Sequence, residues 1–217
     1  MRMNRMKSCF LFVLVMLFSL SAAADFNDGV QAFERGDYRR AYYEWFPLAE
    51  KGDPVAQHNI AVIYDKGLGG AQDDNEAFRY YTLAAKQDNA PAQYNLAVMY
   101  ESGRGTRKDY QAAAEWYRKS AENGFLEAKI SLGKMHETGR GVKQDYTQSF
   151  KYFEEAAREG DAVGQFKLGA LYFMGRGVKQ SHIEALSLFK KTAEKGVPEA
   201  QANLGVMYEK GYGTKIE

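Results

Sequence analysis

The chain has 217 residues, of which 45% are hydrophobic, and its 29 basic residues nearly balance its 28 acidic ones. This hydrophobic content is ample for a packed core, so the composition excludes an intrinsically disordered chain. The near-zero net charge argues against a nucleic-acid-binding protein, because such proteins usually carry a basic patch or stripe.

The first 24 residues have the architecture of a secretory signal peptide. Three basic residues lie within the first seven positions, an apolar run over 9–18 follows, and a run of small residues ends at Ala24. A membrane-spanning helix needs about 20 apolar residues, so this run is too short for an anchor. The pattern predicts cleavage after Ala24 and a periplasmic or secreted mature chain over residues 25–217.

Loss of this segment would change the chemistry of the chain. The only cysteine, Cys9, would leave with it, and the net charge would move from +1 to about −2. The mature chain would then have no thiol for a disulfide, a metal site or a nucleophile. We expect no cofactor, no metal and no membrane span in it.

Residues 25–51 are predicted to form a helical hairpin. Ala32 and Phe33 belong to its first helix, a Gly-Asp-Tyr turn begins at Gly36, and Ala41 and Trp45 belong to its second helix. Trp45 precedes an equivalent tyrosine, Tyr81, by 36 residues, so the hairpin shares the register of the chain that follows.

A period of 36 residues organises that following chain. Aromatic, aliphatic and glycine positions all recur at this spacing, the clearest being Gly69, Gly105, Gly141, Gly177 and Gly213. The period predicts four units at about 54–87, 90–123, 126–159 and 162–195, followed by a partial unit at 198–217. Chains with such periods stack their repeats into one continuous core.

Each unit has the pattern of a helix, a Gly-x-Gly turn and a second helix. In the first half, Ala56, Ile60 and Ile63 fall on one face of a helix, and Ala77, Tyr81 and Ala84 do so in the second half. The first glycine of each turn suits a left-handed helix end. Side chains that can cap the second helices precede them, namely Asp73, Asp109, Asp145 and Ser181. The fold class expected is all-α: a right-handed α/α superhelix, or solenoid, of 36-residue helix–turn–helix repeats.

One position in the first helix of every unit always holds a small residue. It holds Ala61, Ala97, Gly133, Gly169 and Gly205. Glycine within a helix costs about 1 kcal/mol relative to alanine. We therefore expect a neighbouring helix to come too close at this position for a larger side chain.

The pattern resembles the Sel-1-like repeat family, a relative of the tetratricopeptide repeats. The closest unit is APAQYNLAVMYESGRG with AAAEWYRKSAE, and the resemblance covers about residues 38–213. The opening hairpin is similar to a tetratricopeptide unit. The resemblance implies a helical superhelix that acts as an adaptor or scaffold for protein complexes, and an exported member of the family.

The exposed side of the first helices is the predicted binding surface. At 100° per residue, it lies opposite Ile60, Leu96 and their equivalents. In tetratricopeptide-like superhelices this side lines the concave groove, where an apolar stripe would suit a peptide or helix of another protein. The residues expected to bind are His58, Tyr94, Ile130, Lys134, Phe166 and Phe173.

An enzymatic function rests on family analogy alone. Ser131 with Lys134 and Ser187 with Lys190 fit Ser-x-x-Lys, but the Ser-Asp-Asn and Lys-Thr-Gly motifs of penicillin-recognising enzymes are missing. Gly-x-Gly between two helices is a turn, whereas a dinucleotide-binding loop follows a strand. A hydrolase acting on β-lactams or cell-wall material is the alternative, and we expect no enzyme.

The partial unit predicts an incompletely covered helix. The helix from Leu204 to Tyr208 would lose the second helix that the period requires, and solenoids usually end in a polar capping element. Either the sequence belongs to a longer protein or another molecule covers the helix. A homodimer that joins two such ends is the expectation, because a two-fold contact uses the same patch twice.

Overall fold

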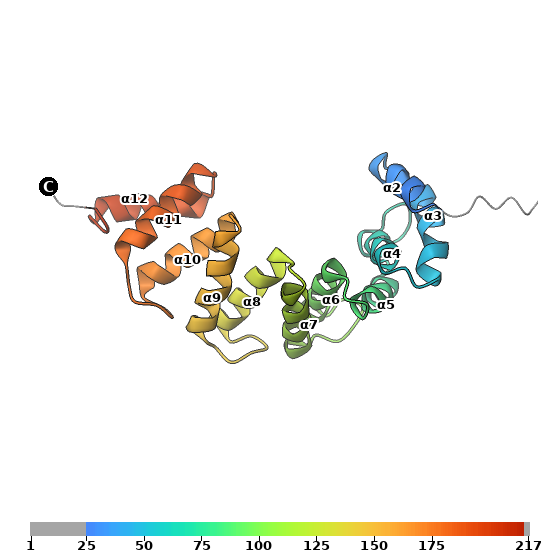
Figure 1. Ribbon diagram of the computed structural model, residues 1–217, viewed down its shortest axis with the longest axis horizontal. Coiled ribbons are helices and arrows are strands. Elements are labelled where there is room, and N and C mark those ends of the chain that lie inside the picture. Colours follow the sequence, from blue (N-terminus) through green and yellow to red (C-terminus); the bar gives the residue numbers. More distant parts are fainter. Residues whose placement is uncertain (1–24, 215–217) are drawn as a thin grey trace, which may run out of the picture. The chain divides into compact units, whose positions relative to one another are not determined.

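The computed structural model describes residues 25–214, and the predicted signal peptide lies outside them. Within that range, the regular secondary structure consists only of helices (Figure 1). The helices are α2 (Phe26–Glu34), α3 (Tyr38–Glu50), α4 (Pro54–Lys66), α5 (Asp74–Ala85), α6 (Ala90–Ser102), α7 (Tyr110–Glu122), α8 (Leu126–Thr138), α9 (Tyr146–Arg158), α10 (Ala162–Met174), α11 (His182–Glu194) and α12 (Pro198–Glu209). The expected all-α architecture of 36-residue helix–turn–helix repeats is confirmed.

The helices belong to two compact units whose boundary falls inside α5. Of the described residues, unit 1 contains those up to Tyr80 and unit 2 contains those from Tyr81 onwards. Successive helices pack against each other in both: α2, α3 and α4 in unit 1, and α6 to α12 in unit 2. Each unit therefore has its own core.

Local chemistry sets the ends of the helices. The Asp109 carboxylate accepts the amide hydrogens of Gln111 and Ala112, both at 3.0 Å, at the start of α7. Asp73 and Asp145 each accept two amide hydrogens in the same way, and the Ser181 hydroxyl accepts that of Glu184. The first helices of the four full repeats end on glycines in the left-handed region, such as Gly103 with a φ of 78°. The capping predicted from the sequence is confirmed.

The second glycine of each turn is explained by a close approach between repeats. A Cβ atom on Gly141 would collide with the main chain of Tyr110, the first residue of the preceding α7. Gly177 meets Tyr146 of α9 in the same way, and Gly213 meets His182 of α11. These glycines also have positive φ values, so no other residue would fit without strain.

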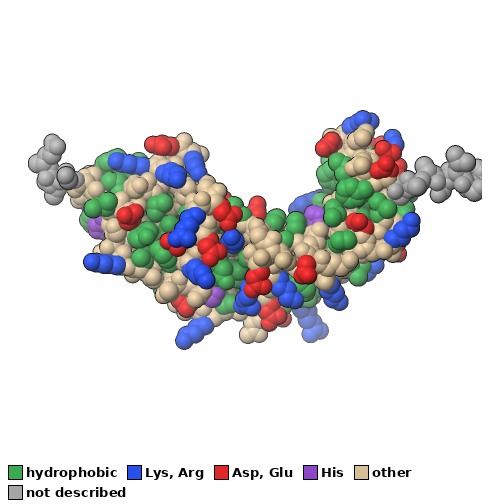
Figure 2. Space-filling model, in the orientation of Figure 1, with side chains coloured by type: hydrophobic (Ala, Val, Ile, Leu, Met, Phe, Trp, Pro, Cys, Tyr) green, Lys and Arg blue, Asp and Glu red, His purple; other side chains and the backbone are tan. Residues whose placement is uncertain are grey.

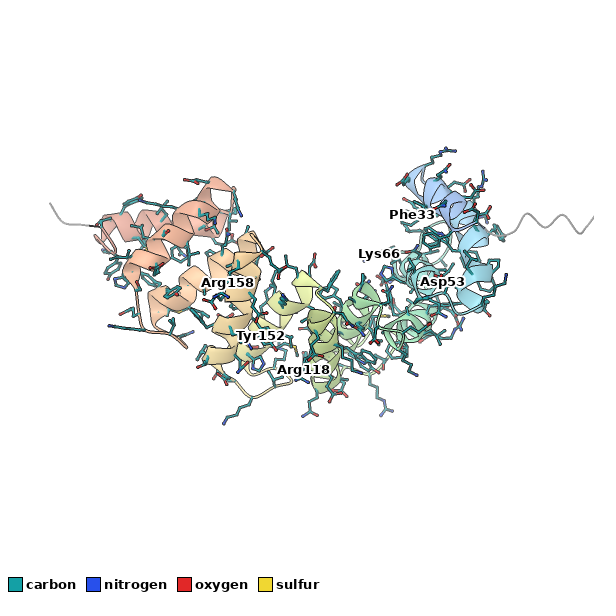
Figure 3. All side chains as sticks on the ribbon, viewed as in Figure 1. Phe33, Asp53, Lys66, Arg118, Tyr152 and Arg158 are labelled. Carbon is teal, nitrogen blue, oxygen red and sulfur yellow. The ribbon has the colours of Figure 1, made fainter. Side chains whose placement is uncertain are left out.

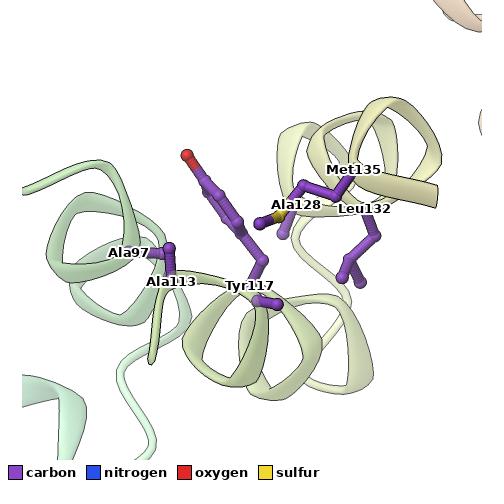
Figure 4. Close-up of a cluster of buried hydrophobic side chains, with 7 residues drawn as sticks. Ala97, Ala113, Tyr117, Ala128, Leu132 and Met135 are labelled. Carbon is purple, nitrogen blue, oxygen red and sulfur yellow. The ribbon is translucent and has the colours of Figure 1, made fainter. Parts of the chain in front are cut away.

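Aromatic side chains fill the spaces between helices. Tyr117 of α7 lies between the small residues of α6 and α7 and the α8 residues Leu132 and Met135 (Figure 4). In the next repeat, a Cβ atom on Gly133 would lie 2.6 Å from the Phe153 ring. A Cβ atom on Gly169 would lie 3.0 Å from the Phe189 ring. The close helix approach predicted at this position is confirmed for both glycines.

A glutamine near the start of the first helices joins successive repeats. The Gln93 side chain is fully buried, and its Nε2 donates to the carbonyl of Ala85 at 3.1 Å, at the end of α5. Gln165 donates to Ala157 near the end of α9, and Gln57 donates to Ala49 near the end of α3. The side-chain amide therefore gives a second donor to a carbonyl in the last turn of the preceding helix, which also accepts the backbone amide hydrogen three residues later.

The core of the hairpin in unit 1 is built around a tryptophan. Trp45 of α3 is 3% exposed, its Nε1 donates to the carbonyl of Phe26 at 3.1 Å, and its ring lies over Gly29. Phe33 packs against the same indole at 5.6 Å between ring centroids. Trp45 is thus the centre of the α2–α3 hairpin.

Candidate protein-binding surface

The predicted apolar stripe in unit 2 runs over α6, α8 and α10, the first helices of successive repeats. Tyr94 of α6 is half-buried, with its ring 5.4 Å from that of Tyr117 and 5.2 Å from that of Phe125. Phe166 of α10 is also half-buried and packs against Phe189 at 5.6 Å. Both aromatic rings therefore present only part of their surface to a partner.

Ile130 is a correction to the sequence analysis. Its side chain is only 8% exposed and belongs to the same cluster as Phe153 of α9 and Leu168 of α10. Helical periodicity placed it opposite the core of its own helix, but the neighbouring helices cover that side as well. The expected exposure of Ile130 is wrong, so the stripe is interrupted at α8.

The two remaining residues of the stripe in unit 2 differ in character. Lys134 is exposed on α8. Phe173 is half-buried on α10, where its ring lies 5.2 Å from the His182 ring and 5.7 Å from the Tyr212 ring. Among the stripe residues of unit 2, Phe173 lines a cavity.

That cavity lies between α10 and α12 and has a volume of about 270 Å³. Met174 and Val206 on its rim are 41% and 48% exposed, which is high for large apolar side chains. In Figure 2, hydrophobic side chains gather over this end of unit 2. The residues that line it are Ala170, Phe173, Met174, Phe189, Asn203, Val206 and Met207. We call this cavity the α10–α12 pocket.

Sequence reasoning missed Met174, although the register held a signal for it. Met174 occupies the position of Ser102 and Thr138 in the two preceding repeats. Phe173 likewise stands where Glu101 and Glu137 stand. A change from polar to apolar at two adjacent positions marks this repeat as different from its neighbours.

On α6 and α8, charged and hydroxyl groups occupy the face that corresponds to the pocket-lining face of α10. Glu137 pairs with Lys167 at 2.9 Å, and Glu101 accepts the Tyr117 hydroxyl hydrogen at 2.9 Å. Burial raises the pKa of the Tyr117 hydroxyl, and the charge of Glu101 raises it further. Arg140 lies 3.7 Å from Glu101. This region is therefore polar and internally paired, in contrast to the α10–α12 pocket.

The sixth predicted residue, His58, lies in unit 1. It is half-buried on α4, and its Nδ1 lies 3.3 Å from the Asn59 side-chain oxygen. Burial lowers the pKa of its imidazole, and the hydrogen bond to Asn59 opposes that shift. A separate cavity of about 230 Å³ in unit 1 is lined by Val30, Phe33, Glu34, Trp45, Asn59 and Val62 (Phe33 is labelled in Figure 3).

The residues that could carry chemistry are scattered in the described part of the chain. Ser187 and Lys190 are both exposed on the surface of α11, and Lys134 is exposed on α8. His136 stacks on Tyr152 at 5.7 Å in place of a packing tyrosine (Tyr152 is labelled in Figure 3). Residues 25–214 bring together no group of three or more His, Cys, Asp or Glu side chains able to hold a metal ion.

Among residues 25–214, no helix combines the length and the hydrophobicity needed to cross a membrane.

Helix pairs of constant length, joined by glycine turns and packed through neighbouring repeats, define an α-helical solenoid protein. The comparison with known families identifies which one. The chain belongs to the Sel1 repeat family, whose repeat model matches residues 54–89, 90–125, 126–161, 162–197 and 198–216. Sel1 repeats form scaffolds that commonly mediate protein–protein interaction.

Solved structures are similar over most of the chain. A Sel1 repeat protein from Oxalobacter formigenes is 32% identical, with a TM-score of 0.84, over 89% of this chain and 79% of the other. A protective antigen of uropathogenic Escherichia coli is 35% identical, with a TM-score of 0.79, over 83% of this chain. This chain spans only 38% of that antigen. No curated protein matches the chain.

A more distant likeness shows the fold alone. The immunity protein PA5088 from Pseudomonas aeruginosa is 20% identical, with a TM-score of 0.52, over 80% of this chain and 67% of the other.

Proposed function

We propose that the protein is an exported scaffold that binds a peptide or protein segment on the α10–α12 pocket. The observation that carries this proposal is an apolar cavity with partly exposed Met174 and Val206 on its rim. Apolar patches rimmed by polar residues mark interaction sites in otherwise water-facing surfaces. Methionine adapts to irregular partner surfaces, which suits a docking pocket.

The surroundings of the pocket favour a segment of a protein over a small ligand. Lys134 is exposed on α8 of the preceding repeat, so a longer partner could reach both an apolar and a basic feature. An amphipathic helix or an extended peptide presents apolar anchors at regular spacing and polar groups between them. Phe166 and Tyr94 contribute their exposed edges, and His58 remains a candidate contact in unit 1. Ile130 contributes nothing because it is buried.

A site-specific crosslinking experiment tests the pocket. A photoreactive amino acid at Met174 should capture a partner in the native cell envelope, whereas the same group at the exposed Lys151 of α9 should not. Val206→Glu should abolish the capture at Met174, because a charge in an apolar contact is costly to desolvate. Equal capture at Met174 and Lys151, or capture unchanged by Val206→Glu, would contradict the proposal.

The N-terminal residue of the mature protein provides a separate test of export. The charged, apolar and small-residue segments of the first 24 residues support cleavage after Ala24. N-terminal sequencing of the protein recovered outside the cytoplasm should begin at Asp25. Exported protein that retains Met1 would contradict it.

A further inference from the structure

We infer that unit 1 carries a second binding site, which takes an extended, proline-containing segment of another protein with a carboxylate beside the proline. The site is a cavity of about 230 Å³ between the start of α3 and the turn that joins α4 to α5. Four tyrosine side chains line it, namely Tyr38, Tyr42, Tyr43 and Tyr64. We call this cavity the tyrosine pocket. It is separate from the cavity beside Trp45 and from the α10–α12 pocket, and the inference does not depend on the proposed function.

The tyrosine pocket is open because the turn beside it carries small side chains. In the turn between α8 and α9 of unit 2, the Arg140 guanidinium carbon lies 5.2 Å from the centre of the Tyr110 ring, and Val142 is half-buried against the same core cluster. The equivalent residues of the turn in unit 1 are Leu68 and Gly70. This turn therefore leaves unfilled the space beside the tyrosine that begins α3.

Two side chains of the tyrosine pocket are exceptional for their position in the repeat. Tyr43 is 73% exposed, whereas the equivalent residues of the other second helices are polar. These residues are Arg79, Glu115, Lys151 and Ser187. Arg39 is exposed, and its equivalents carry no charge. They are Asn75, Gln111, Thr147 and Ile183. Tyrosine and arginine are enriched where proteins bind one another, so both differences favour recognition of a partner at this pocket.

The polar side chains of the tyrosine pocket are hydrogen-bond donors. The Tyr42 and Tyr64 hydroxyl oxygens lie 3.1 Å apart, so one hydroxyl donates to the other and one hydrogen remains available. Burial raises the pKa of the Tyr42 hydroxyl, and its hydrogen bond with Tyr64 raises it further, so this hydroxyl keeps its hydrogen. Arg39 carries the only charge among the described residues that line the pocket, and it forms no ion pair with another described residue. A bound segment therefore has to bring acceptors and a negative charge.

The backbone conformation of the bound segment follows from these donors. A helix offers no free carbonyl along its side, because each accepts an intrahelical hydrogen bond. A strand binds by adding to the edge of a sheet, and the regular secondary structure of residues 25–214 includes no sheet. A polyproline II segment has no internal hydrogen bonds, so its carbonyls are free to accept, and proline brings no N–H group that needs a partner. Such segments bind in grooves lined by aromatic rings. Arg39 adds the preference for a neighbouring carboxylate.

Selection from a random peptide library tests the inference. Phage-displayed peptides that bind the full chain are counter-selected on Gly70→Val, which introduces the residue that the next repeats carry as Val142 and Val178. A Cβ atom on Gly70 would meet no atom within 4 Å, and its φ is not positive, so the variant should fold with the pocket filled. Peptides that bind the unmodified chain but not Gly70→Val should contain proline next to Asp or Glu. The absence of such peptides, or their enrichment in Lys and Arg without proline, would overturn the inference.

Fluorescence anisotropy with a selected peptide locates the binding site. Tyr43→Ser should weaken binding about tenfold, because an aromatic contact is lost. The melting temperature should not change, because Tyr43 is exposed and α11 already carries Ser187 at the equivalent position. Val206→Glu changes the rim of the α10–α12 pocket and should leave binding unchanged. Weaker binding to Val206→Glu with unchanged binding to Tyr43→Ser would place the peptide in the other pocket and overturn the inference.

A double-mutant cycle tests the contact between Arg39 and the carboxylate. Arg39→Gln introduces the residue that α7 carries as Gln111 and should weaken binding about tenfold, since a hydrogen bond between charged groups is lost. An amide in place of the carboxylate of the peptide should have a similar effect, and the two changes together should weaken binding no more than either alone. Arg35→Gln removes an exposed charge of unit 1 outside the pocket lining and is the control that should not affect binding. Additive effects of Arg39→Gln and the amide would overturn the inference.

Discussion

The Gln93 side chain links two second helices of this fold. Its Nε2 donates to the Ala85 carbonyl, and its Oε1 accepts from Asn123, which lies 30 residues further along the chain. The side chain therefore connects the ends of two second helices through one first helix. In the third repeat Lys129 replaces the glutamine and pairs instead with Glu159 at 2.6 Å and Glu155 at 3.7 Å.

Replacement of this glutamine by an apolar residue of similar size should be costly. Gln93→Leu would remove the side-chain hydrogen bond to the Ala85 carbonyl, which keeps the amide hydrogen of Asp88 at 3.2 Å, and the bond from the exposed Asn123. A hydrogen bond contributes about 0.5–1.5 kcal/mol net, so the free energy of unfolding should fall by roughly that much. Urea denaturation followed by circular dichroism measures it. The exposed Gln201→Leu is the matched control and should change stability by no more than about 0.5 kcal/mol.

His58 makes the stability of the protein depend on pH. Burial lowers the pKa of its imidazole, so the unfolded state binds a proton more readily than the folded state does. Stability from this group is therefore fully present above the unfolded pKa of about 6.5 and is lost as the pH falls below it. Thermal melting between about pH 5 and pH 7 should show a shallower pH dependence in His58→Phe than in the unmodified protein. Identical slopes would mean that His58 titrates as it does in water.

The sequence predicted part of this residue-scale chemistry. The left-handed glycines and the caps followed from the positions of Gly, Asp and Ser at helix ends, because those preferences are local. The buried role of Gln93 did not follow, since an amide near a helix start looks like an exposed polar residue until the preceding helix is in place. The burial of Ile130 was missed for the same reason, because its cover comes from α9 and α10.

At the scale of the element, the packing of a first helix on the second helix of its repeat depends on one small residue. Gly169 lies against both Phe189 and Leu188, with distances from an added Cβ atom of 3.0 Å and 3.2 Å. The periodicity of the sequence was sufficient to predict this approach. It could not predict the α10–α12 pocket, because that cavity depends on how two first helices from different repeats lie beside each other.

A large side chain at Gly169 should separate these two helices. Gly169→Leu has no space for its side chain, so we expect a loss of at least about 1–3 kcal/mol, as is typical of overpacking. Calorimetric melting measures the change. The same substitution at Gly205 meets no neighbour and should not lower the melting temperature. An equal effect at the two glycines would show that helix propensity, and not packing, determines the result.

For the molecule as a whole, repeat architecture makes stability local. Each repeat is stabilised mainly by its immediate neighbours, so helices with fewer packed sides open more easily. The last described helix, α12, buries Ala200 and Met207, whereas α10 buries a larger set that includes Gln165 and Leu171. The period of 36 residues was enough to predict this architecture from the sequence.

Amide hydrogen exchange should therefore rank the helices of unit 2. Amides in α12 should exchange faster than those in α8 and α10, because opening α12 exposes less apolar surface. Mass spectrometry of peptides from the exchanged protein measures the rates. Exchange in α12 as slow as that in α10 would contradict the ranking.

The second glycine of each Gly-x-Gly turn packs against the start of the second helix of the preceding repeat, a contact that we call the clasp. The clasp restricts which changes of sequence length the gene can tolerate. Gly141, Gly177 and Gly213 leave no room for a side chain against Tyr110, Tyr146 and His182. A single inserted or deleted codon in a turn would pull the glycine away from its partner and misplace every following helix. Duplication of a complete repeat would instead recreate the same clasp at the new junction. Lineages of this gene should therefore differ by whole repeats and by substitutions on exposed faces, and seldom by the length of a turn.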